Sequence, residues 1–272
     1  MRVIREGRVQ HLLSCKHAFA ELASPAVVVA GAVNWRRGMP MAQVLAAADS
    51  ALAIAESRGA FAVQQAQQTE TFATVLGEDE WRRRLVEAIS DRRLELVRYP
   101  VVGRQKELVH HECPLRIQLD ESGHFETAAK WLPMALRTGL ISRIDEAAVE
   151  LALTQIRSDL QPRGVNISPA SLADSAFVPR LRSHLASSPD AARLLWLEVA
   201  ETAAVDRFDM VRELCKQLRP LGAKIGLEHA GDRLGRIKLL FEAGLDYVKL
   251  APGAMLDAGC GAGTSRDLLR AR

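Results

Sequence analysis

Short apolar runs alternate with amphipathic stretches along most of this chain. Residues 26–33 form a nearly uninterrupted apolar run that is typical of a buried strand. Residues 41–57 carry apolar side chains at helical spacing, and Arg58-Gly59 ends the predicted helix. A short strand is expected at 61–63, and the polar residues 64–74 are expected to form a connector. The first part of the chain therefore predicts a small α/β unit.

Helices and strands continue to alternate after this connector. A helix at 81–89 precedes two strand-like stretches, 94–102 and 108–119, joined by a turn short enough for an antiparallel hairpin. Further helices are expected at 128–138, 145–160, 177–188, 207–218 and 233–243, and further strands at 164–167, 194–199, 224–227 and 247–250. Repeated strand–helix units predict an α/β fold, an incomplete TIM-like barrel with an antiparallel first strand. The glycine-rich residues 257–263 are expected to form a loop leading into a short terminal helix.

Composition narrows the class of protein. Of the 272 residues, 48% are hydrophobic and 25% are charged, which is enough apolar chain to bury a core and argues against disorder. A net charge of +3 gives no electrostatic case for a nucleic-acid polymer as a partner. No segment has the length of a membrane span, and the four cysteines lack metal-ligand spacing. We therefore expect a cytoplasmic protein with free thiols.

Polar side chains stand at the ends of several predicted strands, where barrel enzymes place their chemistry. They are Glu112, Asn166, Glu198, Glu228 and Lys249. A single polar residue at a strand end is ordinary, but five on five strands are expected to converge on one rim. The consecutive His110, His111 and Glu112 do not predict a zinc site, because neighbours on a strand point to opposite faces.

Five segments are similar, in order and spacing, to the motifs of one family. Residues 111–116 stand at an EALLR signature, 131–141 resemble FIPLAEETGLI, 165–168 resemble VNLS, 197–201 resemble LEITE, and 245–250 resemble VDYLKID. From about Trp81 to Met255 the chain thus resembles the EAL-type cyclic di-GMP phosphodiesterases. Residues 41–63 resemble the last helix and strand of a GGDEF-type domain.

The resemblance implies a division of the chain. Residues 1–66 are expected to be the C-terminal part of a GGDEF-like domain, 67–79 a linker, and 80–272 an EAL-like barrel. The cyclase signature of a complete GGDEF domain would precede Met1, so cyclase activity is not expected of the chain as given. An eight-fold barrel takes about 250 residues, more than the region 80–272 provides, so counterparts of the last two strands of the EAL barrel are not expected in this chain.

The resemblance also implies site residues. The family's metal ligands fall on Glu112, Asn166, Glu198 and Glu228, and its lysine near the attacking water falls on Lys249. Glu201 would support a loop of the active site if the domain is an enzyme. Contacts to the cyclic dinucleotide are implied for Arg116, Leu115, Pro133 and Tyr99, the last standing where the family has a glutamine.

Several departures from the family pattern argue against catalysis. His229 replaces the second of two aspartates, and imidazole is a poor ligand for magnesium. Cys113-Pro114 interrupts the signature, and a proline within a strand removes a ladder donor. Leu136 replaces an acidic residue. We therefore expect a catalytically inactive EAL-like domain that acts, without a cofactor, as a cyclic di-GMP-binding or regulatory module in bacterial second-messenger signalling.

Two alternatives remain open. One is a weak phosphodiesterase that uses magnesium or manganese to convert cyclic di-GMP to linear pGpG. The other is a protein-binding scaffold with no nucleotide ligand. An open barrel edge would also predict a homodimer or a protein partner.

Overall fold

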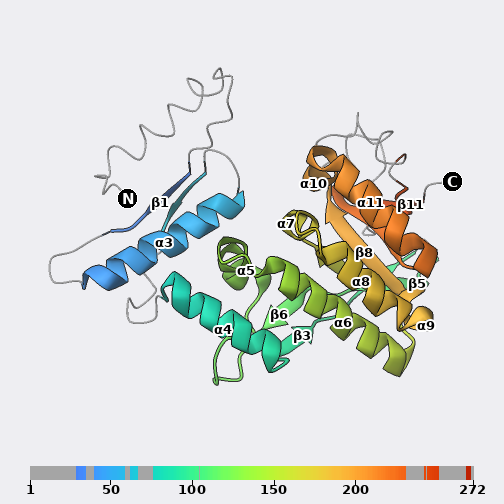
Figure 1. Cartoon of the computed structure of the whole chain (residues 1–272), viewed down its shortest axis with the longest axis horizontal. Helices are drawn as coiled ribbons and strands as arrows, with labels where there is room; N and C mark the ends of the chain where they lie inside the picture. Colours follow the sequence, from blue (N-terminus) through green and yellow to red (C-terminus); the bar gives the residue numbers. More distant parts are fainter. Residues whose placement is uncertain are drawn as a thin grey trace, which may run out of the picture. The chain divides into compact units, whose positions relative to one another are not determined.

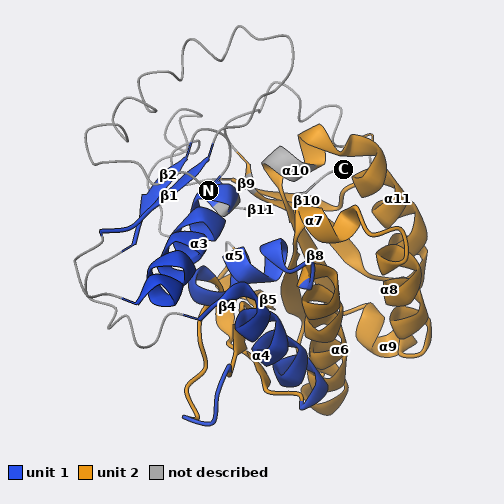
Figure 2. Ribbon diagram, turned by 60° about the vertical axis from the view of Figure 1, so that its left-hand side comes forward, with its two compact units in different colours: residues 1–91, 119–122, 129–140 blue, residues 92–118, 123–128, 141–272 orange. Residues whose placement is uncertain are grey.

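A computed structural model describes residues 29–34, 40–58, 62–66, 76–103, 105–230, 242, 244–250 and 268–270. The chain forms two compact units, which are coloured separately in Figure 2. The first unit comprises residues 1–91, 119–122 and 129–140, and the second comprises residues 92–118, 123–128 and 141–272. Within the described ranges, no helix is both long and apolar enough to cross a membrane.

The first unit opens with a parallel strand–helix–strand arrangement. It consists of β1 (Ala30–Ala32), α3 (Met41–Arg58) and β2 (Val63–Gln65). Parallel strands need a crossover, which α3 provides. A side chain at Gly31 would place its Cβ 2.5 Å from the carbonyl oxygen of Ala48, so glycine allows the helix to pack directly on β1. The predicted small α/β unit is present, with its second strand two residues later than expected.

Two further helices, α4 (Glu78–Ser90) and α5 (Ala128–Arg137), belong largely to the first unit. Each buries a tryptophan, Trp81 on α4 and Trp131 on α5. The guanidinium of Arg137 lies 2.9 Å from the Glu78 carboxylate, and the carboxylates of Asp49 and Glu56 on α3 lie within 3.9 Å of it. One cation therefore links three helices of this unit.

The second unit contains a curled sheet that forms a half-barrel. In the described part of the chain, seven strands lie in the order β11-β10-β9-β8-β7-β5-β4. Their bounds are β4 (Tyr99–Val102), β5 (Leu108–Glu112), β7 (Arg163–Ile167), β8 (Leu195–Ala200), β9 (Lys224–Ala230), β10 (Tyr247–Leu250) and β11 (Leu268–Arg270). The strands from β5 to β10 run parallel, whereas β4 and β11 are antiparallel to their neighbours. The predicted α/β fold, an incomplete TIM-like barrel with an antiparallel first strand, is confirmed.

Helices cover the outer face of this half-barrel, and Figure 1 shows α6, α8 and α11 side by side. The helices of this unit are α6 (Ile141–Asp159), α7 (Pro169–Leu172), α8 (Phe177–Ala186), α9 (Pro189–Ala192), α10 (Glu201–Asp206) and α11 (Phe208–Leu218), followed by the 3-10 turn η2 (Arg219–Leu221). Alternation along β8 separates Leu195, Leu197 and Val199 from Trp196 and Glu198 on the opposite face. All five side chains are buried.

Each of the two long strands expected near the start of the barrel is interrupted in the structure. Residues 94–102 divide into β3 (Leu94–Leu96) and β4, and residues 108–119 divide into β5 and β6 (Leu115–Ile117). β3 and β6 form a separate antiparallel pair. The second interruption falls at Cys113-Pro114, where proline has no amide hydrogen for the ladder. The expectation of two continuous strands was therefore wrong, although the predicted antiparallel turn between β4 and β5 is confirmed.

The end of the chain also differs from expectation. Residues 268–270 form β11 and not part of a terminal helix, because they pair with β10 and satisfy backbone groups along its edge. The parallel edge expected to be open is thus paired over three residues. The glycine-rich residues 257–263 and all but one residue of the helix expected at 233–243 lie outside the described residues.

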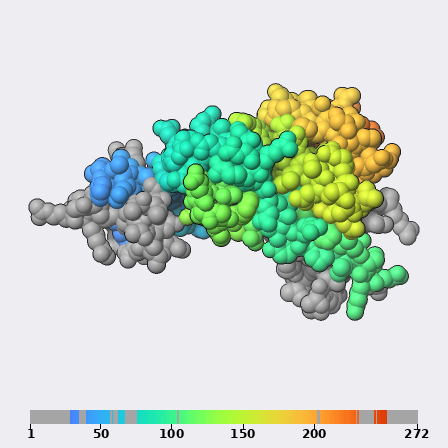
Figure 3. Space-filling model, turned by 90° about the horizontal axis from the view of Figure 1, so that it is seen from below, coloured from blue at the N-terminus to red at the C-terminus, as the bar shows by residue number. Residues whose placement is uncertain are grey.

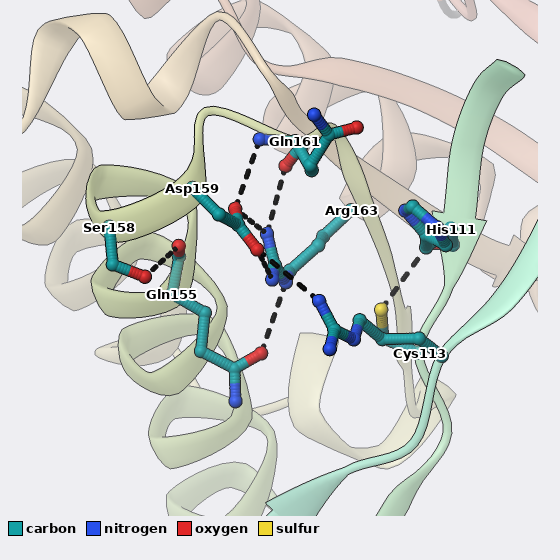
Figure 4. A network of polar contacts seen from close by, with 8 residues as sticks. His111, Cys113, Gln155, Ser158, Asp159, Gln161 and Arg163 are labelled. Atoms are coloured by element: carbon teal, nitrogen blue, oxygen red, sulfur yellow. Dashed lines mark hydrogen bonds and ion pairs between the residues drawn. The ribbon is translucent and has the colours of Figure 1, made fainter.

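A polar network lies on the helix-facing side of β5 and β7 (Figure 4). The side chain of Arg163 is fully buried and makes two hydrogen bonds to the carboxylate of Asp159, at 2.8 and 2.6 Å. A third goes to Gln155 at 3.0 Å. A buried guanidinium requires such partners, so this network joins the C-terminal end of α6 to the start of β7.

Cys113 and Cys215 are free thiols, as predicted, and both are buried. Burial raises the pKa of the Cys113 thiol to about 11 and that of the Cys215 thiol to about 12. Both thiols are therefore protonated at neutral pH, and neither is a nucleophile. Cys15 and Cys260 lie outside the described residues.

Candidate functional site

The carboxyl ends of the parallel strands bring three of the predicted residues into one buried cluster. The ammonium of Lys249 on β10 lies 2.6 Å from Oε2 of Glu198 on β8. The same ammonium lies 3.8 Å from Oε2 of Glu112, the last residue of β5. The side chain of Glu198 is fully buried and that of Lys249 nearly so. Convergence at the rim, inferred from strand-end positions, therefore holds for these three residues.

The remaining predicted metal ligands, Asn166 and Glu228, lie on the neighbouring strands β7 and β9. Asn166 on β7 is exposed and is the register partner of Glu198, so the two residues are neighbours across the ladder. Glu228 on β9 pairs in register with Ala200, two residues further along β8 than Glu198. Glu201 is the first residue of α10 and is buried directly after β8. His229 also belongs to β9, and its side chain lies outside the described atoms.

Two residues that the sequence did not assign to the site complete the surroundings of Glu198. The hydroxyl of Tyr247 donates a 3.0 Å hydrogen bond to Oε1 of Glu198. Nε2 of His110 lies 3.3 Å from the same oxygen, and the imidazole is fully buried. Tyr247 stands two residues before Lys249, and His110 stands two residues before Glu112. The period-two spacing of a strand was thus the signal that could have identified both.

Aromatic rings form a floor beneath this cluster. The His110 imidazole stacks on the ring of Trp196 with centroids 4.4 Å apart, and the Tyr247 ring lies 4.8 Å from that of Trp196. The ammonium of Lys224 lies 4.3 Å from the centroid of the Trp196 ring. The prediction that Trp196 is a core residue is confirmed, although its ring packs inside the half-barrel.

Two glycines make room for this floor. A Cβ at Gly164 on β7 would lie 2.9 Å from Cδ2 of His110, and one at Gly226 on β9 would lie 2.5 Å from Cε1 of Tyr247. The rings therefore occupy space that any larger residue at these strand positions would fill.

The charges in the cluster decide the protonation of its acid. Burial alone raises the pKa of the Glu198 carboxyl, but His110 and Lys249 outweigh burial, so the pKa lies below its usual range. Burial, together with the charge of Glu198, raises the pKa of the Tyr247 phenol well above its usual range. At neutral pH, Glu198 is therefore an ionised carboxylate paired with Lys249, and Tyr247 is a neutral donor.

His111 differs from its neighbours on β5. The buried imidazole of His110 and the carboxylate of Glu112 face the cluster, whereas His111 lies with the Arg163 network on the other side of the sheet (Figure 4). Burial and the charges of Arg163 and Arg98 lower the pKa of His111. These three consecutive residues therefore alternate between the two faces of the sheet, as neighbours on a strand are expected to do.

The predicted ligand contacts occupy separate elements. Tyr99 begins β4 and is the register partner of Glu112. Leu115 and Arg116 lie in β6, where Arg116 is opposite Glu95 of β3. Pro133 is buried within α5, in the other compact unit. Their roles toward a ligand stay predictions.

The cluster can be tested as a metal site from its donor set. Within the described residues, no three histidine, cysteine, aspartate or glutamate side chains are grouped so that they could hold one metal ion. Oε2 of Glu198 already accepts from Lys249 and Oε1 from Tyr247. A pair of divalent cations needs several free carboxylate oxygens. The described donors therefore do not fit the metal pair that the resemblance implied.

The fold and this rim define the class of protein: an α/β half-barrel with acidic, amide and amine side chains on the carboxyl ends of its parallel strands. The family model for the EAL domain matches residues 82–271. This chain belongs to the EAL domain family.

Relatives and solved structures agree with this assignment. The chain is 25% identical over 177 residues to a cyclic di-GMP phosphodiesterase, PdeB of Shewanella oneidensis, covering 62% of this chain and 21% of the relative. The Vibrio cholerae LapD S helix-GGDEF-EAL structure bound to c-di-GMP superposes with a TM-score of 0.69 at 21% identity, covering 80% of this chain and 54% of that one. The Xanthomonas citri FimX EAL domain in complex with c-diGMP gives 0.60 at 23% identity, covering 68% and 74%. The chain thus spans about a fifth of the curated relative and about half of the first of these structures.

Proposed function

We propose that this chain is an EAL domain that acts as a cyclic di-GMP-binding or regulatory module and does not hydrolyse cyclic di-GMP. The observation that carries this proposal is that both carboxylate oxygens of Glu198 already accept hydrogen bonds, from Tyr247 and from Lys249. Membership of the EAL family supports the class of ligand.

The electrostatics of the cluster support the loss of catalysis. A metal that used Glu198 would have to displace a buried ammonium from 2.6 Å, or share the carboxylate with it. Both would place like charges close together in a region of low dielectric, where repulsion is strong. Two divalent cations would therefore bind weakly beside the charged Lys249, even with the donors Glu112, Asn166, Glu198 and Glu228.

The sequence around the rim supports the same conclusion. β5 ends at Glu112 because Cys113-Pro114 interrupts the strand, which changes the backbone directly after this carboxylate. His229 occupies the position at which the family pattern has its second aspartate. Imidazole suits zinc and other transition ions better than magnesium. No cofactor is therefore part of the proposal.

Binding can survive the loss of hydrolysis because it uses other groups. Arg116 offers a planar fork of donors for a phosphate or a guanine edge, and its side chain is partly exposed. Leu115, Pro133 and Tyr99 are the further contacts that the resemblance implies. Phosphate recognition by a guanidinium needs no metal, so affinity and catalysis are separable.

Calorimetry with cyclic di-GMP, in buffer containing EDTA, tests the proposed binding. We expect micromolar or tighter binding that Arg116→Ala weakens at least tenfold, a loss of about 1.4 kcal/mol. Arg212→Ala is the matched control, because Arg212 is exposed, and its ion pair with Asp209 and its cation–π contact with Phe208 both lie within its own helix. Absence of heat at high protein concentration would contradict the proposal, as would equal losses in the two variants.

One observation favours weak phosphodiesterase activity as a second candidate. Glu112, Glu198 and Lys249 are brought together, with Asn166 beside them across the ladder. Incubation of cyclic di-GMP with the protein and magnesium, manganese or zinc, followed by chromatography, separates the two candidates. Linear pGpG above background, abolished by Glu112→Ala, would establish the enzyme.

The proposal also covers the N-terminal unit, the location and the partners of this chain. A parallel strand–helix–strand unit at residues 30–65 supports the C-terminal remnant of a GGDEF-like domain. A cytoplasmic location and a homodimeric or protein partner are proposed with it. Sedimentation velocity at several protein concentrations tests the dimer.

A further inference from the structure

A hollow of about 720 Å³ opens on the second unit, at the amino ends of β9 and β10. Its lining residues come from the last turns of α11, from η2 and from the residues that lead into the two strands. α11 and η2 lie at the surface, and orange atoms from this part of the chain are exposed in Figure 3. The cluster of Glu112, Glu198 and Lys249 stands on the carboxyl ends of the strands, so the hollow lies at the opposite end of the sheet.

Cationic side chains gather around this hollow. Lys216 in α11 and Arg219 directly after the helix are three residues apart, so they lie on one side of it. Lys224 begins β9, and its ammonium lies 4.3 Å from the centroid of the Trp196 ring. Among the described residues that line the hollow, Asp246 supplies the only carboxylate. An excess of cations at a concave surface produces a positive potential that attracts anions.

Asp246 holds the guanidinium of Arg219 in place. Nε of Arg219 donates to Oδ1 of Asp246 at 3.1 Å, and Nη2 lies 2.8 Å from the same oxygen. Oδ2 of Asp246 accepts from the backbone amide of Ile225 at 2.8 Å, which fixes the carboxylate in turn. A Cβ at Gly244, where φ is 90°, would lie 3.2 Å from Nη1 of Arg219, so glycine keeps the space beside this nitrogen open. Within the described residues, Nη1 donates no hydrogen bond and is therefore a positioned but unused donor.

The other groups of the hollow suit a phosphorylated molecule. Lys216 is exposed, and in the described part of the chain its ammonium forms no ion pair. Guanidinium and ammonium groups are the side chains that bind phosphate oxygens in proteins. Pro220 and Ala223 also line the hollow and offer apolar surface to an organic group. The volume falls within the range of small-molecule pockets, about 300–1,000 Å³.

We propose that this hollow binds a phosphate monoester of nucleotide size. The phosphate accepts from Nη1 of Arg219 and from the ammonium of Lys216, and Lys224 adds positive charge. These three cations exceed the one carboxylate by two charges, which matches the charge of about −1.5 to −2 on a phosphate monoester at neutral pH. The site uses no residue of the rim, so it does not depend on the proposed function.

Titration calorimetry with AMP, adenosine and inorganic phosphate, in EDTA at low salt, tests this site. We expect AMP to bind and adenosine, which lacks the phosphate, to bind at least about tenfold more weakly. Lys216→Gln should weaken AMP binding roughly tenfold, the effect of losing one hydrogen bond to a charged group. Lys216→Arg keeps the charge and should bind within about threefold of the unchanged protein. Lys106→Gln is the matched control, because it removes the same charge from an exposed lysine between β4 and β5.

Each outcome supports or overturns the site. Absence of AMP binding at millimolar concentration overturns it, and so does adenosine that binds as tightly as AMP. Equal losses in Lys216→Gln and Lys106→Gln would show that AMP responds only to the net charge of the protein, and the hollow would then not be the site. Inorganic phosphate that binds as tightly as AMP would refute the contribution of an organic group. None of these results bears on cyclic di-GMP at the rim, so the two proposals fail separately.

Discussion

The buried pair of Lys249 and Glu198 permits a quantitative test of the site. Lys249→Met keeps the length of the side chain and removes its charge, leaving the carboxylate of Glu198 buried with the Tyr247 hydroxyl as its hydrogen-bond donor. Removing one partner of a buried ion pair costs about 3–5 kcal/mol. Domains of ordinary stability unfold at a cost of about 5–15 kcal/mol, so this loss is a large fraction of the total.

Thermal unfolding in EDTA measures the effect. At roughly 2–4 °C per kcal/mol, the melting temperature of Lys249→Met is expected to fall by about 6–20 °C. The loss should be smaller at pH 5 than at pH 8, because the unpaired carboxyl can take up a proton and become neutral. The double variant Lys249→Met/Glu198→Gln removes both charges and should recover most of the stability. A fall of less than about 1 kcal/mol, or a double variant no more stable than the single one, would refute the buried ion pair.

Three further predictions concern stability. Burial raises the pKa of Asp145 to about 7, although Asp145 accepts hydrogen bonds that act in the opposite direction. Between about pH 4 and pH 7 the native state therefore holds one more proton than the unfolded state, and the protein loses stability as the pH rises through this range. Urea titrations at several pH values should show the free energy of unfolding falling by at most about 1.4 kcal/mol per pH unit in this window, and Asp145→Asn should abolish this fall. An equal pH dependence in both proteins would contradict the assignment. Leu160 is exposed with φ 54°, so Leu160→Gly should stabilise by about 1 kcal/mol in the same assay, and a loss would show that the backbone there is unstrained. Gly226→Ala should destabilise the protein by about 1–3 kcal/mol, because the added Cβ would clash with the Tyr247 ring. No change in stability would show that the ring can move aside and would contradict this prediction.

Periodicity predicted much of this fold because the parallel strands are short, apolar and separated by amphipathic helices. β7, β8, β9 and β10 all lie within three residues of their expected bounds. The break at Cys113-Pro114 follows from the chemistry of proline, which the sequence already showed. β11 could not be predicted, because three residues carry little pattern and their pairing with β10 is a long-range contact.

The site was predictable only where polar residues stood out from apolar strands. Glu112, Glu198 and Lys249 were found in this way, and the structure joins them. Tyr247 and His110 were missed as partners of Glu198, because an aromatic residue in a strand is ordinarily core. Period-two spacing places them on the same strand faces as Glu112 and Lys249, but a single sequence does not show which strands become neighbours of β8, or in what register.

The central claim is that the domain binds cyclic di-GMP without cleaving it, and one experiment tests this most directly. The protein is mixed with cyclic di-GMP and magnesium or manganese, and the bound and free nucleotides are separated and identified by chromatography after extended incubation. We predict that intact cyclic di-GMP is recovered with the protein and that no pGpG forms above the level of a protein-free control. Recovery of pGpG that depends on Glu112, or the absence of bound nucleotide, would contradict the account.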